Sequence, residues 1–137
     1  MGYCMAQRDS KFSMTAESAK KALKEIKSLA GSESVKDGGG RHYSWVVTED
    51  FLKAETFSEA MRAWRWEVEE GKSKTGTVVA VSFEGEKLGD DATLFKAIAP
   101  YVEAGSWIEM EGEDGCLWRW VFDGKTVEEK SGRVVFD

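Results

Sequence analysis

Residues 107–122 read WIEMEGEDGCLWRWVF, and this stretch decides the predicted fold of the chain. Two runs of alternating apolar residues flank Glu113-Asp114-Gly115, and Asp-Gly between such runs is a strong signal for a β-hairpin. Glycine adopts the positive φ that a tight turn requires, because it has no Cβ. The stretch therefore predicts two antiparallel strands joined by a short turn.

The length of this turn decides which side chains share a face of the sheet. A three-residue loop with a left-handed Gly115 places Met110 opposite Trp118 and Glu109 opposite Arg119, and directly opposed residues share a face. A two- or four-residue loop instead places the tryptophans beside Glu109, as an exposed aromatic surface. We favour the three-residue loop because it separates apolar from charged side chains. Its apolar face holds Ile108, Met110, Trp118, Trp120 and Phe122, and its charged face holds Glu109, Glu111 and Arg119.

The composition is that of a soluble globular protein. The chain has 137 residues, of which 32% are charged, and six Trp, seven Phe and three Tyr give bulk to a core. This length suits one domain over residues 1–137.

Acidic residues are concentrated in the C-terminal part of the chain. The formal net charge is −6, and residues 84–137 hold thirteen Asp and Glu against six Lys and Arg. Such a balance repels a phosphate backbone, so we expect no direct binding of duplex nucleic acid. A protein partner with a basic surface is the better electrostatic match.

The two cysteines, Cys4 and Cys116, are far apart in the sequence, which argues against a structural zinc site and leaves their redox state open. No segment is apolar enough for a signal peptide or a membrane span, so we expect a cytoplasmic protein without a membrane partner. The only histidine is His42, which leaves few options for an activated nucleophile. We therefore expect no enzyme, no cofactor and no metal.

The pattern along the rest of the chain predicts three helices among about six to eight strands. Helices are expected after the capping residues Thr15 and Thr56 and after Asp90 or Asp91, with a helical turn from Thr48. Strands are expected near the N-terminus, at residues 43–47 and 126–136, and at residues 77–83, where near-continuous apolarity suggests cover on both faces. This alternation predicts an α+β fold with a mainly antiparallel sheet.

Two sets of residues are candidates for a binding site. The acidic set is the predicted contact with a basic partner, and it consists of Glu109, Glu111, Glu113 and Asp114. The aromatic set is the alternative, a surface for a small ligand or single-stranded nucleic acid, and it consists of Trp107, Trp118 and Trp120.

The segments SWIEMEGEDGCLWRWVF and FEGEKLGDDATLFKAIAPYVEAGS, with the opening MGYCMAQRDSKFSM and HYSWV, are similar to a group of small bacterial and phage-associated proteins without an assigned activity. The resemblance covers most of the chain and implies an accessory gene, carried by a phage or mobile element. By analogy with small acidic accessory proteins such as anti-CRISPR proteins, we expect a non-enzymatic inhibitor of a basic, nucleic-acid-binding partner.

Overall fold

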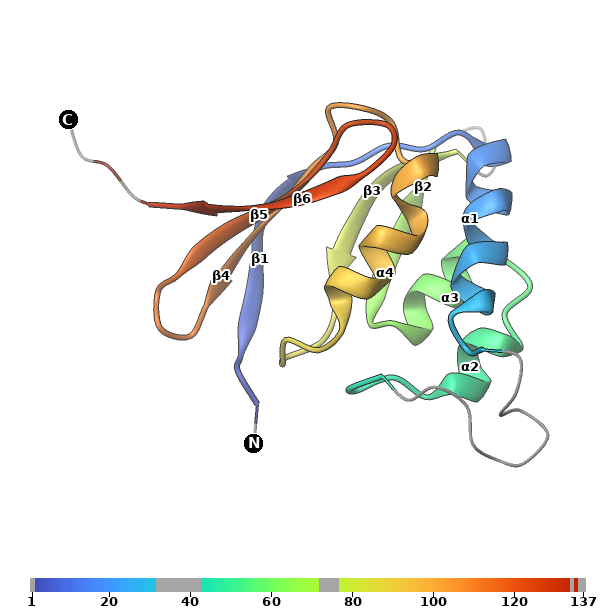
Figure 1. Ribbon diagram of the computed structural model, residues 1–137, viewed down its shortest axis with the longest axis horizontal. Helices are drawn as coiled ribbons and strands as arrows, with labels where there is room; N and C mark the ends of the chain where they lie inside the picture. Colours follow the sequence, from blue (N-terminus) through green and yellow to red (C-terminus); the bar gives the residue numbers. More distant parts are fainter. Residues whose placement is uncertain (1, 32–42, 72–76, 134, 136–137) are drawn as a thin grey trace.

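The computed structural model describes residues 2–31, 43–71, 77–133 and 135. The fold is α+β with antiparallel strands, as predicted, and Figure 1 shows the β4–β5 hairpin and β6 extending away from the helices. The chain runs through β1 (Met5–Lys11), α1 (Ala16–Ser28), α2 (Thr48–Leu52), α3 (Phe57–Ala63), β2 (Trp66–Glu70), β3 (Val78–Phe83), α4 (Asp91–Ile98), the short 3₁₀ helix η1 (Ala99–Tyr101), β4 (Trp107–Gly112), β5 (Leu117–Phe122) and β6 (Val127–Gly132).

The six strands form two sheets that are joined at their edges. The larger sheet has the order β1-β4-β5-β6 and the smaller one pairs β2 with β3. Antiparallel bridges at Cys4 and Lys87 and at Met14 and Val78 join β1 to β3 on either side of a gap. The Gln7 side chain spans this gap, because its amide donates to the Val81 carbonyl at 3.0 Å and accepts from the Phe83 N–H at 2.7 Å. One glutamine side chain thus replaces part of the missing strand pairing.

The central hairpin has the predicted register. Met110 pairs with Trp118 and Glu109 with Arg119, and Gly115 has φ of +85°. The three-residue loop is therefore confirmed, and the alternative registers are excluded. The apolar face of the hairpin points toward the helices, and the charged face forms the outer face of the sheet.

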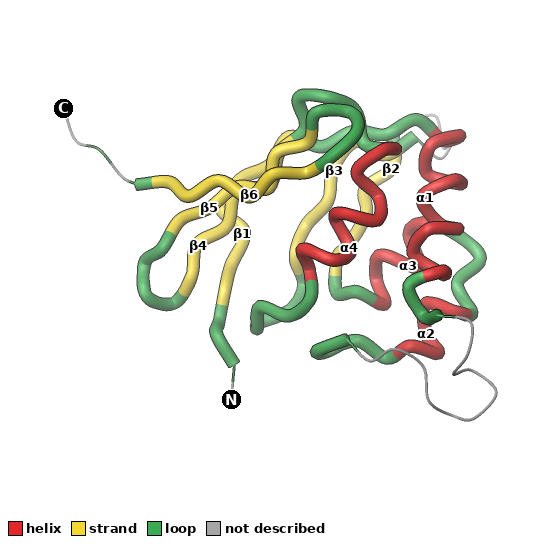
Figure 2. Tube along the Cα trace, in the orientation of Figure 1, coloured by secondary structure: helices red, strands yellow, loops and turns green. Residues whose placement is uncertain are grey.

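Aromatic rings fill the core between the sheets and α4. In Figure 2, β2 and β3 lie behind α4, and Phe95 of α4 packs on Trp66 of β2 with ring centroids 5.1 Å apart. Phe95 also contacts Trp120 at 4.8 Å and Phe122 at 5.9 Å, and all four rings are buried. These contacts fix the distance between α4 and both sheets.

The local signals for helix ends are confirmed in most cases. Thr15 caps α1 by accepting the Ser18 N–H, and Thr56 caps α3 by accepting the Glu59 N–H. α4 ends at Ile98, before Pro100, as the restriction on residues that precede proline predicts. The Thr48 turn is a short helix, α2, so the described residues form four α-helices where three were predicted.

Two predictions about local structure are wrong, and a third holds only in part. Residues 43–47 form a turn closed by a bridge between Tyr43 and Val46, because residue 45 is left-handed and breaks the extended backbone. β3 is open on one face, where Val79 is 47% exposed. Asp90 is the N-cap residue of α4, as predicted, but its carboxylate accepts the Ser44 N–H and makes no capping hydrogen bond to the helix.

Some predictions fall on residues that the structure does not describe. The composition of residues 31–41 (GSESVKDGGGR) predicts a loop, and that of residues 71–76 predicts a turn. Both ranges lie largely outside the described residues, and His42 lies there too. The predicted strand at residues 126–136 is observed as β6, and residues 134 and 136 lie outside the described part.

Candidate binding groove

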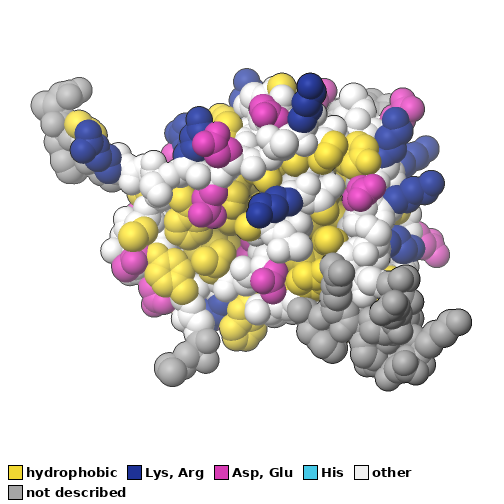
Figure 3. All heavy atoms as spheres, viewed as in Figure 1, with side chains coloured by type: hydrophobic (Ala, Val, Ile, Leu, Met, Phe, Trp, Pro, Cys, Tyr) yellow, Lys and Arg dark blue, Asp and Glu magenta, His cyan; other side chains and the backbone are white. Residues whose placement is uncertain are grey.

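Two clefts meet at Leu88, one against the free end of the hairpin and the other against the turn that precedes α2. One has a volume of about 210 Å³ and the other about 390 Å³, and Leu88 lines both. We call them together the aromatic groove. Figure 3 shows hydrophobic side chains gathered on this face of the molecule, over the hairpin and beside α4. The groove is lined by Gly2, Tyr3, Ser44, Trp45, Leu88, Cys116, Leu117, Trp118, Glu129 and Ser131.

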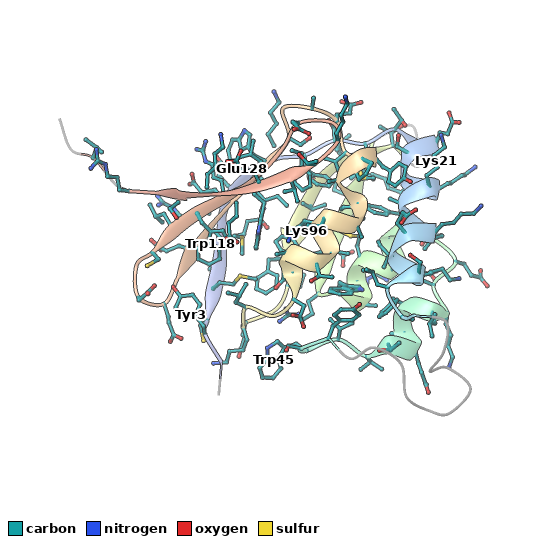
Figure 4. All side chains as sticks on the ribbon, viewed as in Figure 1. Tyr3, Lys21, Trp45, Lys96, Trp118 and Glu128 are labelled. Carbon is teal, nitrogen blue, oxygen red and sulfur yellow. The ribbon has the colours of Figure 1, made fainter. Side chains whose placement is uncertain are left out.

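One wall of the groove is a pair of aromatic rings. Trp118 of β5 is half-buried, and its ring centroid lies 6.4 Å from that of Tyr3. Trp118 also packs edge-on against the buried Trp120 at 5.9 Å, which anchors it to the core. Figure 4 shows Trp118 above Tyr3 on the same side of the hairpin, with Lys96 of α4 opposite them.

Tyr3 is held in place by the tip of the hairpin. Its hydroxyl donates to Asp114, which also accepts the Cys116 N–H at 3.1 Å. The hydrogen bond to Asp114 raises the pKa of Tyr3 to about 12, and the same bond is the main reason why the pKa of Asp114 is lowered. The ring therefore stays neutral and fixed over a wide pH range.

The other end of the groove is formed by Trp45, in the turn before α2. This side chain is 52% exposed, and its φ is +68°. The ring lies against backbone: a Cβ built on Gly2 would be 3.2 Å from Trp45 Cζ2, and one on Gly89 would be 3.0 Å from Trp45 Cδ1. Larger residues at these two positions would push the indole away.

A polar network behind Trp45 fixes this turn. Asp90 accepts the Ser44 N–H at 2.7 Å, which ties the turn to the start of α4. The neighbouring Asp91 is 0% exposed, and it accepts the Trp66 Nε1–H at 2.9 Å and the Gly89 N–H at 3.0 Å. Arg65 compensates its charge, with Nη2 3.1 Å from Asp91 Oδ2. The loop that carries Leu88 and Gly89 is therefore anchored in the core.

The predicted acidic set does not form one contact surface. Glu109 lies on the outer face of the sheet, where it accepts Arg119 Nε at 2.8 Å and pairs with Arg8 at 3.7 Å. Glu111 is exposed on that same face. Glu113 and Asp114 lie at the hairpin tip and bind the N-terminal segment, Glu113 by accepting the Cys4 N–H at 2.9 Å. Three of the four carboxylates are thus engaged within the protein.

The predicted aromatic set also does not form one surface. Trp120 is 1% exposed and belongs to the core, so its assignment to an exposed surface is wrong. Trp107 lies on the outer face, with the Arg119 guanidinium 4.3 Å from its ring centroid. Only Trp118 lines the groove. The reason is strand alternation, which sends residue 107 to the face opposite 118 and 120.

Sequence reasoning missed Tyr3, Trp45 and Leu88 as groove residues. Tyr3 was predicted only as part of an opening strand, and Trp45 as part of a strand that does not form. The signal that places Trp45 is the contact between Ser44 and Asp90, which are 46 positions apart. No local pattern in the sequence reveals such a contact.

Comparison of the chain with models of known protein families, with curated proteins and with solved structures finds no match. Within the described ranges, no helix is both long enough and apolar enough to cross a membrane. Among the same residues, no group of three or more His, Cys, Asp or Glu side chains is arranged to hold a metal ion.

Proposed function

We propose that this protein is a non-enzymatic interaction protein that binds a segment of a basic partner protein in the aromatic groove. Trp45 and Trp118 would be the two anchors, at opposite ends of the groove, with Tyr3 and Leu88 between them. Large aromatic side chains are enriched among the residues that dominate binding energy at protein interfaces.

The observation that carries this proposal is the conformation of Trp45. A non-glycine residue with positive φ costs about 1–2 kcal/mol, and for a bulky residue it is a genuine outlier. Here the cost is not offset by burial, since more than half of the side chain is exposed. Strained residues of this kind cluster at functional sites. A tryptophan held at the surface in a strained turn is best explained by a contact with a partner.

Charge favours a basic partner over a nucleic acid. The net charge of −6 repels phosphates and attracts a positively charged surface. Glu129 lines the groove and is exposed, so it is available to a lysine or arginine of the bound segment. Glu111 on the outer face would add to the long-range attraction without direct contact.

Selection from a displayed library of random peptides tests the proposal. We expect enriched peptides to combine Lys or Arg with aromatic or large aliphatic residues. Trp118→Ala should weaken binding of these peptides at least about tenfold, since interface anchors contribute about 2 kcal/mol or more.

Trp107→Ala is the matched control, because Trp107 is a half-buried tryptophan on the opposite face of the same hairpin. It should leave binding unchanged. Equal losses from Trp107→Ala and Trp118→Ala, or no enrichment of any peptide, would contradict a groove-based interaction.

Inhibition of a nucleic-acid-binding enzyme by mimicry of phosphate charge is a narrower form of the same proposal. It predicts that affinity falls steeply with added salt. Reversing the charges of Glu109 and Glu111, which lie on the outer face away from the groove, would then weaken binding more than Trp118→Ala does. The opposite order would favour the groove.

Binding of single-stranded nucleic acid is the second candidate, and the tilted Tyr3–Trp118 ring pair is what favours it. Rings at the surface can stack on bases in a sequence-tolerant way. A binding measurement with a thymine oligonucleotide in place of the peptides separates the two candidates. Quenching of tryptophan fluorescence by the oligonucleotide, lost in Trp118→Ala, would replace a protein partner with a nucleic acid.

A further inference from the structure

Cys4 and Lys87 form a thiol–amine pair beside the aromatic groove. Lys87 Nζ lies 2.9 Å from Cys4 Sγ, and the two residues also pair through their backbones in an antiparallel bridge. Backbone hydrogen bonds on either side hold the bridge: Met5 N–H donates to the Glu86 carbonyl at 2.9 Å, and Leu88 N–H donates to the Tyr3 carbonyl at 2.7 Å. Backbone hydrogen bonds therefore hold together the two segments that carry Cys4 and Lys87.

The charge around this pair favours a reactive thiol. A thiolate is the nucleophilic form of cysteine, and a neighbouring ammonium stabilises it. The hydrogen bond to Cys4 is the main reason why the pKa of Lys87 is raised, so this amine stays protonated beside the sulfur. Lys87 packs against Gly2, where a Cβ would lie 3.2 Å from Lys87 Cδ, and Gly2 lines the cleft of about 390 Å³. Cys4 itself is only partly buried.

The sulfur of the second thiol faces a carboxylate in place of an ammonium. Cys116 is exposed, but its Sγ lies 3.2 Å from the Asp114 carboxylate, and this hydrogen bond and charge raise the pKa of Cys116. A negative neighbour disfavours the thiolate. The more exposed cysteine is therefore the one held in the less reactive form.

We propose that the Cys4–Lys87 pair is a site of covalent modification by hydroperoxides and other small electrophiles. With hydrogen peroxide, the Cys4 thiolate attacks one oxygen, the O–O bond breaks, and a sulfenic acid forms on Cys4. The departing hydroxide takes a proton from the Lys87 ammonium and leaves as water. Sulfur is oxidised, peroxide is reduced, and the lysine ends as a neutral amine.

Modification of the two thiols in the folded full-length protein tests this inference. The protein is treated with hydrogen peroxide and dimedone, or with limiting iodoacetamide, and the occupancy of Cys4 and Cys116 is read by peptide mass spectrometry. We expect Cys4 to react about tenfold faster than Cys116, because an ammonium faces the Cys4 sulfur and a carboxylate faces the Cys116 sulfur. Equal rates, or a faster Cys116, would overturn the proposal.

Variants of Lys87 separate charge from packing. Lys87→Met should remove the advantage of Cys4, and Lys87→Arg should keep most of it, since arginine retains the positive charge. An unchanged Cys4 rate in Lys87→Met would count against the pair. In urea the two thiols should react at similar rates, because the fold creates the difference. These rates are measured without a partner, so their outcome is independent of the proposed function of the groove.

Discussion

The segments Trp64-Arg65-Trp66 and Trp118-Arg119-Trp120 have the same sequence but different backbones. Arg65 has φ of +74°, which ends α3, and both flanking tryptophans are buried. Its guanidinium turns inward and binds the buried Asp91. Arg119 lies in an extended strand, where alternation sends it to the outer face and leaves Trp118 at the edge of the groove.

The difference shows that long-range partners decide what a short motif does. In the first segment the buried Asp91 carboxylate is available, so the Arg65 side chain packs in the interior and stabilises the core. In the second segment the arginine is half-exposed and contacts a partly buried glutamate and the face of a tryptophan on the outer face of the sheet. The helical body is thus closed by its own contacts, while the hairpin end leaves an aromatic ring partly exposed at the surface.

Removal of the Asp91 carboxylate should have the largest effect on stability. Asp91→Ala leaves the Arg65 charge without its partner and removes acceptors from Trp66 Nε1–H and Gly89 N–H. Breaking a buried pair in this way costs about 3–5 kcal/mol. Urea unfolding measures the loss, and Asp91→Asn should lose less because it keeps one acceptor. A loss below about 1 kcal/mol for Asp91→Ala would mean that the Arg65–Asp91 pair contributes no more to stability than the Arg119–Glu109 pair on the outer face.

Truncation of one tryptophan from each segment should separate core from groove. Trp66→Ala creates a cavity in the core and should cost about 3–5 kcal/mol of unfolding free energy. Trp118→Ala should cost about 1–2 kcal/mol, because the ring is only half-buried. Urea unfolding of both variants gives the comparison. Equal losses would mean that Trp118 is a core residue like Trp66.

The exposed ion pair of the second segment should contribute little. Glu109→Ala removes the acceptor of Arg119, whose side chain is 48% exposed. Exposed pairs of this kind contribute about 0–1 kcal/mol. Thermal unfolding should change by no more than a few degrees, in contrast to Asp91→Ala. A loss comparable to that of Asp91→Ala would show that the outer face is as tightly coupled as the interior.

The smallest effect concerns the pH dependence of the groove wall. The hydrogen bond to Asp114 raises the pKa of Tyr3 to about 12, above the ordinary value of about 10. Its contribution to stability is therefore complete below the ordinary value and is lost as the pH rises through the folded value. Tyrosinate absorbance should show one group titrating late, and Asp114→Asn should move it back toward 10. A tyrosine titration that Asp114→Asn leaves unchanged would show that the hydrogen bond to Asp114 does not raise the pKa of Tyr3.

The hairpin and the helix boundaries could be predicted because their determinants are local. Gly115 and the alternation around it fix the register, and Thr15, Thr56 and Pro100 mark helix ends within a few residues. The burial of Asp91 could not be predicted, since its partner Arg65 lies 26 positions away and takes a conformation unusual for arginine. For the same reason, the predicted acidic set lies on the correctly predicted hairpin but does not coincide with the groove.

The strain at Trp45 provides the most direct test of the proposed function. Trp45→Gly removes the aromatic anchor and relieves the unfavourable φ, since glycine adopts positive φ freely. Urea unfolding and peptide binding are measured on the same preparation of this variant. We expect unchanged or greater stability together with loss of binding. A less stable variant that still binds its peptides would show that Trp45 serves the fold and not a partner.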